Sequence, residues 1–176
     1  MRKVVLAAIL GLAVVSASHA GEAGKYIKGS VGYANINNAL ENEDEQKTSV
    51  QIAFGKACCK NFSLEGLVGY KDFGDGIYTI GLETKYLFAN SSDFTPYIGV
   101  GVDYDYFDDF EDWVLSPLAV LGAEYQFDRN WAVDLNVKYK PAVEVSGIDN
   151  TASPKVIDTV RFDEQYTVNL GVVYKF

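Results

Sequence analysis

The chain has 176 residues, with 15 lysine and arginine residues against 24 aspartate and glutamate residues, so its net charge at pH 7 is −9. This length predicts a single domain, and the acidic balance argues against nucleic-acid binding, because phosphate-binding surfaces are basic. Sixteen glycines and 14% aromatic residues against four prolines favour strands and tight turns over helices. A mean hydropathy of −0.01 excludes a protein held in a membrane by bulk hydrophobicity.

The first twenty residues have the pattern of a secretory signal peptide. Arg2 and Lys3 form a charged region, an apolar run from Val4 to Val15 follows, and a small-x-small cleavage site ends at Ala20. The apolar run is shorter than the ~20 residues that a membrane-spanning helix needs. We therefore predict a signal peptide at 1–20 and a mature domain at 21–176, with a net charge of −11 and without the chain's one histidine, His19.

Eight segments of the mature chain alternate apolar and polar residues with a period of two, which predicts strands with two unlike faces. The connections are turns or polar loops, and the longest is expected at 141–165. No helical periodicity competes with this pattern. The predicted strands lie at about 26–36, 47–55, 62–71, 78–88, 96–105, 116–127, 131–140 and 166–176.

The last strand shows the pattern most clearly. Alternate residues from Tyr166 to Phe176 are apolar or aromatic, and the intervening ones are small or polar except Val173. Eleven residues at about 3.3 Å each, tilted by about 45°, cross a hydrocarbon layer of roughly 25–30 Å. Eight such strands predict an all-β, antiparallel up-and-down barrel without exposed edges.

Which face points outward decides between a membrane barrel and a soluble, ligand-carrying barrel. Small residues such as Gly81 and Gly122 occupy the polar face, which suits a crowded interior. Aromatic residues of the apolar face gather at the strand ends, as at two water–lipid interfaces. The predicted signal peptide would export the chain to the compartment where membrane barrels assemble. We therefore predict a transmembrane barrel with its apolar face in lipid. One belt comprises Tyr26, Phe54, Phe62, Phe88, Tyr125, Phe127, Trp131, Tyr174 and Phe176, and the other comprises Tyr33, Tyr70, Tyr78, Tyr104, Trp113, Tyr139 and Tyr166.

The polar face then lines the lumen and carries charges of both signs. Unpaired charges in a narrow barrel are costly, so we expect these residues to pair with one another and to fill the lumen. The alternative is a narrow polar conduit for ions or small solutes, for which eight strands leave little room. The predicted lumen charge network is Glu65, Lys71, Glu83, Lys85, Asp103, Glu124, Asp134, Lys138 and Lys175.

Metal and cofactor sites are not predicted. Cys58 and Cys59 are adjacent and have no further cysteine or histidine beside them, so we interpret them as free thiols or a strained disulfide in a turn. Acidic residues around 103–112 match no defined calcium loop, and we expect a solvated loop. The alternative is that divalent cations bridge this loop to lipopolysaccharide phosphates. The weak candidates for such a site are Asp105, Asp108, Asp109, Glu111 and Asp112.

Two segments carry a resemblance to a known family. The terminal Tyr174-Lys-Phe176 and the hairpin LGAEYQFDRNWAVDLNVKY from Leu121 to Tyr139 resemble the small eight-stranded outer-membrane barrels of the OmpA, OmpX and opacity type. The resemblance implies a monomer in the outer membrane of a Gram-negative bacterium, in contact with membrane lipid and lipopolysaccharide, with both termini in the periplasm. It also implies that Tyr174 and Phe176 belong to the signal that the barrel-assembly machinery reads. We expect no domain after the barrel, and therefore no peptidoglycan binding of the kind found in full-length OmpA proteins.

Catalysis is not expected either. Enzymes among such small barrels rely on histidine, which the predicted mature chain lacks, and a serine–carboxylate pair without an imidazole or lysine base is a poor nucleophile. We therefore predict a non-enzymatic outer-membrane barrel with a structural or surface-interaction, adhesion-type role. The alternative is a narrow, porin-like channel.

Overall fold

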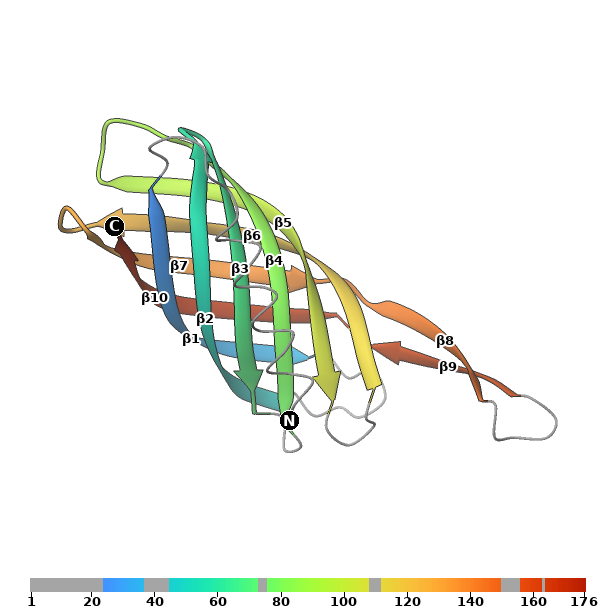
Figure 1. The fold of residues 1–176 in the computed structure, drawn as a ribbon. Coiled ribbons are helices and arrows are strands. Elements are labelled where there is room, and N and C mark those ends of the chain that lie inside the picture. Colours follow the sequence, from blue (N-terminus) through green and yellow to red (C-terminus); the bar gives the residue numbers. More distant parts are fainter. Residues whose placement is uncertain (1–23, 37–44, 73–75, 108–111, 150–155, 163) are drawn as a thin grey trace.

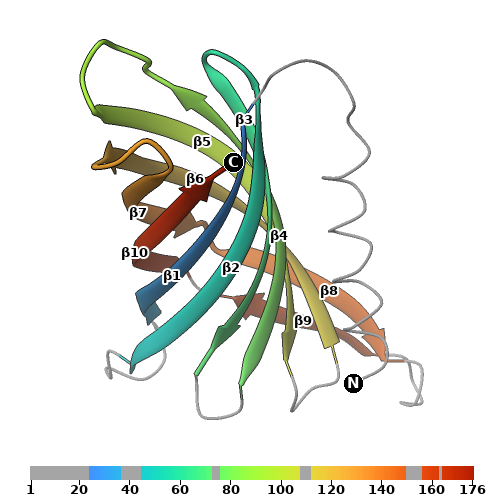
Figure 2. The same cartoon turned by 60° about the vertical axis from the view of Figure 1, so that its left-hand side comes forward.

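Alternating side chains build eight long strands that close into a barrel, and two short strands extend from one end of it (Figures 1 and 2). The computed structural model describes residues 24–36, 45–72, 76–107, 112–149, 156–162 and 164–176. The strands are β1 (Lys25–Ile36), β2 (Glu45–Cys59), β3 (Phe62–Lys71), β4 (Ile77–Leu87), β5 (Phe94–Phe107), β6 (Asp112–Gln126), β7 (Trp131–Lys140), β8 (Val143–Asp149), β9 (Val156–Phe162) and β10 (Gln165–Lys175).

The barrel is antiparallel throughout, with the order β1-β10-β7-β6-β5-β4-β3-β2. Pairing of β1 with β10, from Tyr26↔Lys175 to Ile36↔Gln165, closes it. The prediction of an eight-stranded up-and-down barrel is thereby confirmed. The predicted signal peptide lies outside the described residues. None of the described residues forms a helix long and apolar enough to cross a membrane.

The two faces of the strands follow the predicted parity. Large apolar side chains point away from the barrel, and Leu121 and Leu135 remain 63% and 54% exposed. Charged side chains of the alternate set are buried inside, and Glu65 and Glu83 are fully covered. Val173, the apolar residue of the polar set in the last strand, is also buried inside. An apolar outer face around a polar interior is the arrangement of a barrel whose solvent is lipid.

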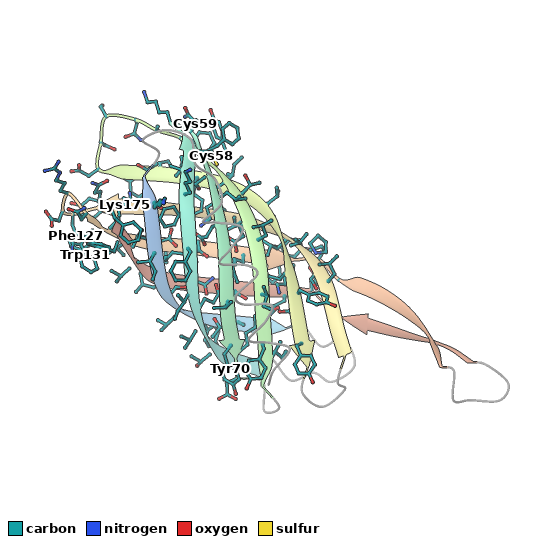
Figure 3. All side chains as sticks on the ribbon, in the orientation of Figure 1. Cys58, Cys59, Tyr70, Phe127, Trp131 and Lys175 are labelled. Carbon is teal, nitrogen blue, oxygen red and sulfur yellow. The ribbon has the colours of Figure 1, made fainter. Side chains whose placement is uncertain are left out.

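Aromatic side chains gather at both ends of the outer face. At one end Tyr70 lies 5.3 Å from Tyr78, between ring centroids. At the other, where Lys25 at the start of β1 meets Phe176, the centroids of Trp131 and Tyr174 are 4.8 Å apart. Figure 3 shows the two ends, with Tyr70 at one and Cys58, Cys59, Phe127, Trp131 and Lys175 at the other. We refer to these as the loop end and the terminus end.

Two tyrosines, Tyr26 and Tyr97, lie inside the barrel. The prediction that Tyr26 belongs to an outer belt is therefore wrong, because its side chain is buried in the lumen. Glycines on neighbouring strands make room for both rings. A Cβ atom at Gly122 would lie 2.6 Å from Cζ of Tyr97, and one at Gly55 would overlap the ring of Tyr26.

The predicted long loop at 141–165 is also wrong, because it contains the β8–β9 hairpin. The β7–β10 ladder pairs Tyr139 with Tyr166, and β8–β9 begins at Val143 and Phe162. Val143 follows Tyr139 by four residues, and Phe162 precedes Tyr166 by four residues. The β8–β9 ladder therefore continues the register of the β7–β10 ladder. The hairpin is thus an extension of β7 and β10 beyond the barrel wall (Figure 1).

Replacement of Leu135 by lysine tests the outward face. Leu135 lies midway along β7, opposite Leu170 and Ala123, so Leu135→Lys puts a charge in the hydrocarbon layer. We expect a loss of about 2–4 kcal/mol of unfolding free energy, measured by urea unfolding in lipid vesicles. Ser91→Lys in the exposed β4–β5 turn is the control and should cost under about 0.5 kcal/mol. Equal stability of both variants would contradict a lipid-facing Leu135.

Candidate functional site: the lumen charge cluster

The lumen holds a charge cluster that begins near the terminus end at Glu65 of β3. Its carboxylate accepts a hydrogen bond of 2.7 Å from Nζ of Lys85 and lies 2.8 Å from Nζ of Lys28. The hydroxyl of Tyr26 donates to the same carboxylate at 3.0 Å. Lys28 and Lys85 come from β1 and β4, so this contact ties strands on both sides of β3 together through the interior.

Asp134 of β7 is the second acidic centre. The hydroxyl of Tyr97 donates to Oδ2 at 2.6 Å, and Nδ2 of Asn136 donates to Oδ1 at 2.6 Å. Lys28 also approaches Asp134, at 3.6 Å, and so connects the two carboxylates. The ammonium of Lys85 lies 5.0 Å from the ring centroid of Tyr97, which adds a cation–π contact.

Glu83 of β4 continues the cluster towards the middle of the barrel. It forms a short ion pair with Lys138 of β7, whose Nζ also donates to Oε1 of Gln51 at 3.1 Å. Lys85 lies 3.7 Å from Glu83 on its other side. Lys85 is therefore shared between Glu65 and Glu83, and the charges form a network rather than isolated pairs.

A second group of charges lies near the loop end. Lys140 of β7 contacts Asp103 at 2.8 Å and Asp105 at 2.6 Å, both on β5. Asp105 also accepts a hydrogen bond from Oγ1 of Thr79 at 2.5 Å and lies 3.5 Å from Lys71. Since β5 and β7 are the two neighbours of β6, Lys140 bridges them behind that strand.

Charge balance characterises the buried cluster as a whole. We define it as five lysines and five carboxylates, all at most 5% exposed, which cancel in net charge. Such burial is tolerable only because each ion has a partner of opposite sign, since an uncompensated buried charge is strongly destabilising. The members are Lys28, Lys71, Lys85, Lys138, Lys140, Glu65, Glu83, Asp103, Asp105 and Asp134.

Seven of the nine residues of the predicted network lie in this cluster. The other two, Glu124 and Lys175, form a separate pair at the terminus end, 2.8 Å apart and more exposed. The predicted network omitted Lys28, Asp105 and Lys140. Their strand parity is the same as that of the residues it included, so the alternation pattern could have found them.

Asp105, a weak candidate cation ligand in the sequence, is held by two lysines and a threonine inside the barrel. Asp108, Asp109 and Glu111 lie outside the described residues, as does the side chain of Asp112. Within the described part of the chain, no group of three or more histidine, cysteine or acidic residues is arranged to hold a metal ion. Cys58 and Cys59 are exposed thiols at the end of β2.

The family model and the curated relative that match this chain both describe outer-membrane proteins. Residues 4–176 match the family described as the outer membrane protein beta-barrel domain. Outer membrane protein AlkL of Ectopseudomonas oleovorans is 28% identical over 127 residues, which cover 66% of this chain. The match spans 52% of AlkL, about half of that relative.

Two solved structures share the fold. Neisserial surface protein A superposes with a TM-score of 0.61 at 16% identity, covering 86% of this chain and 97% of that protein. Ail, the attachment invasion locus protein of Yersinia pestis, gives 0.54 at 13% identity, covering 89% and 100%. The chain belongs to the outer membrane protein beta-barrel family, and the membrane in which it resides is the outer membrane of Gram-negative bacteria.

Substitution of a buried carboxylate should destabilise the barrel more than the same substitution at its rim. Glu65→Gln leaves Lys28 and Lys85 without their closest carboxylate, and we expect a loss of about 3–5 kcal/mol. Glu124→Gln removes the partner of the more exposed Lys175 and should cost under about 1 kcal/mol. Urea unfolding in vesicles measures both. Equal losses would show that the buried network contributes no more than a surface ion pair.

Proposed function

We propose that this outer-membrane barrel is a non-enzymatic protein with a closed lumen and a surface-interaction role of the adhesion type. The observation that carries the closed lumen is the ion-paired cluster across it. Lys28 and Lys85 reach Glu65 from different strands, and Lys138 reaches Glu83. Side chains that already satisfy one another's charge leave an ion no binding site along the axis without breaking a buried pair.

The absence of a nucleophile system in the cluster supports a non-enzymatic role. Each of the five cluster lysines lies in an ion pair with a carboxylate, whereas a general base must be free to take a proton from a nucleophile. The chain's one histidine, His19, lies in the predicted signal peptide.

The loop end supports the surface role. The β8–β9 hairpin extends from the wall at this end, opposite the end at which β1 begins and β10 finishes (Figures 1 and 2). Both the Neisserial surface protein and the Yersinia attachment protein are named for roles at the cell surface, although their low identity conveys only the fold. We infer that the termini face the periplasm and the loop end faces outward, where it contacts lipopolysaccharide and external partners.

A narrow channel is the second candidate, and one observation favours it. Oδ1 of Asp103 and Oδ1 of Asn169 are buried without a hydrogen-bond partner among the described residues. Polar atoms of this kind line hydrated conduits, because water satisfies them. The two candidates differ in whether the lumen passes current.

Planar-bilayer recording separates them. We expect the refolded protein to pass no steady current, because the ion-paired side chains fill the lumen. Glu83→Ala/Lys138→Ala removes one pair without changing net charge, and should give small, steady conductance if these side chains close the lumen. Heat-modifiability on gels checks that both proteins fold. A steady current through the unchanged protein would favour the channel.

Native cysteines report the orientation. Cys58 and Cys59 are exposed at the terminus end, so a membrane-impermeant maleimide should label them only after the outer membrane is permeabilised. In a Cys58→Ser/Cys59→Ser background, Asp72→Cys introduces a thiol at the exposed β3–β4 connection of the loop end, which should react on intact cells. The reverse pattern would place the termini outside.

A further inference from the structure

The seam where the first and last strands of the barrel meet has a glycine on its inner face. Gly32 of β1 pairs with Asn169 of β10 on one side and with Ser49 of β2 on the other. Asn169 is 1% exposed, and Ser49 is fully buried. Because Gly32 has no side chain, the side chains of its two neighbours can approach each other over β1 inside the barrel.

Two polar atoms converge on the space that Gly32 leaves open. A Cβ atom at this position would lie 2.0 Å from Oδ1 of Asn169 and 2.5 Å from Oγ of Ser49. The two oxygens are therefore separated by no more than the sum of these distances, yet they do not hydrogen-bond to each other. Both atoms are buried, and neither has a hydrogen-bond partner among the described residues.

A row of side chains fixes which atom of Asn169 faces Ser49. Asp134 of β7, as a carboxylate, can only accept hydrogen bonds, so Asn136 donates to it through Nδ2, at 2.6 Å. The carbonyl oxygen of Asn136 is then left to accept, and Nδ2 of Asn169 donates to it at 3.0 Å. This leaves Oδ1 of Asn169 as an acceptor at the end of the row, beside the space over Gly32.

Water is the occupant that fits this space. Oδ1 of Asn169 needs a donor, which excludes an anion, and the hydroxyl of Ser49 can donate or accept. The two oxygens that converge here are fewer ligands than hard cations take, and a cation would add an uncompensated charge to a neutral cluster. A water molecule carries no charge, and with hydrogen bonds of about 2.8 Å it can reach both oxygens.

We propose that the lumen binds one water molecule over Gly32, which donates a hydrogen bond to Oδ1 of Asn169 and is also hydrogen-bonded to Oγ of Ser49. The β1–β10 ladder closes the barrel through backbone hydrogen bonds. The water adds a side-chain connection from β10 to β2 across β1, and so it extends the row that begins at Asp134 over the seam. One enclosed water satisfies Asn169 without providing a path for ions, which distinguishes it from a hydrated conduit.

A crystal structure of the refolded protein, at a resolution that shows ordered water, tests the site directly. We expect one water within about 2.6–3.2 Å of both oxygens. A direct hydrogen bond between Ser49 and Asn169, or a space over Gly32 without water, would overturn the proposal. A continuous column of water along the lumen would also overturn it, because the oxygens would then line a conduit.

Substitution of Ser49 tests the connection in a membrane. Ser49→Ala leaves the water with one side-chain partner, so the ratio of unfolded to folded protein should rise about three- to tenfold, the effect of one hydrogen bond. Ser49→Asn supplies an amide that can donate directly to Oδ1 of Asn169 in place of the water, and its ratio should stay within about twofold of that of the unchanged protein. Urea unfolding in lipid vesicles measures both. An unchanged ratio in Ser49→Ala, or no recovery in Ser49→Asn, would contradict the connection.

Two glycines of β1 provide a matched pair. Gly29 is exposed on the outer face, and a Cβ atom there would have no heavy atom within 4 Å. Gly32→Ala places a methyl group against Asn169 and Ser49 and expels the water, so its unfolding ratio should rise about tenfold or more. Gly29→Ala should change the ratio by less than about twofold. Equal ratios would show that the space over Gly32 is not used.

The outcome for the water site is separable from that for the closed lumen. A barrel that passes no current and holds no water over Gly32 loses this site but keeps its closed lumen. A barrel that conducts and holds one water there keeps the site and loses the closed lumen.

Discussion

Neutralisation of charge inside a narrow lumen is the constraint on which the rest of this structure depends. Eight strands enclose little more than their own side chains, so each ammonium on the inner face needs a carboxylate within reach. Glu65 meets this need for Lys28 and Lys85, and Asp105 meets it for Lys140 and Lys71. Because these partners come from different strands, the pairs also connect regions of the wall that no backbone ladder joins.

Sequence alternation predicted the two faces because the side-chain period of a strand is two. Residues such as Glu83 and Lys138 could be assigned to the lumen from parity alone, and so could Lys28. Parity does not say which carboxylate meets which lysine, because that depends on the stagger of strands around the closed barrel. Tyr26 was misplaced for a related reason: an aromatic residue at a strand end fits either an outer belt or the interior, and the room that Gly55 provides is visible only once the strands are paired.

The β8–β9 hairpin was missed because its alternating pattern is short. Val143-Glu144-Val145-Ser146 alternates apolar and polar residues, but β8 and β9 have seven residues each, fewer than the roughly 9–11 that a membrane-spanning strand needs. Its existence follows from the ladder below it, since β7 and β10 are held in register by the barrel and the same register continues upward. Pairing that costs a great deal to nucleate in an isolated hairpin here extends a ladder that already exists.

Different interactions therefore stabilise the membrane-spanning wall and the loop end. Lipid on the outside and ion pairs on the inside hold the strands up to about the level of Ala119 and Tyr139, and any unpaired backbone there would face hydrocarbon. Above that level water satisfies backbone groups, and Asp112–Leu118 of β6 can persist with β5 as its one described partner. Pro117 and Pro141 lie at the boundary between the membrane-spanning wall and the water-exposed loop end. Proline cannot donate a backbone hydrogen bond to a neighbouring strand, so it destabilises least where water can replace that bond. A sequence change at the loop end should therefore weaken the barrel less than a change in the membrane-spanning wall.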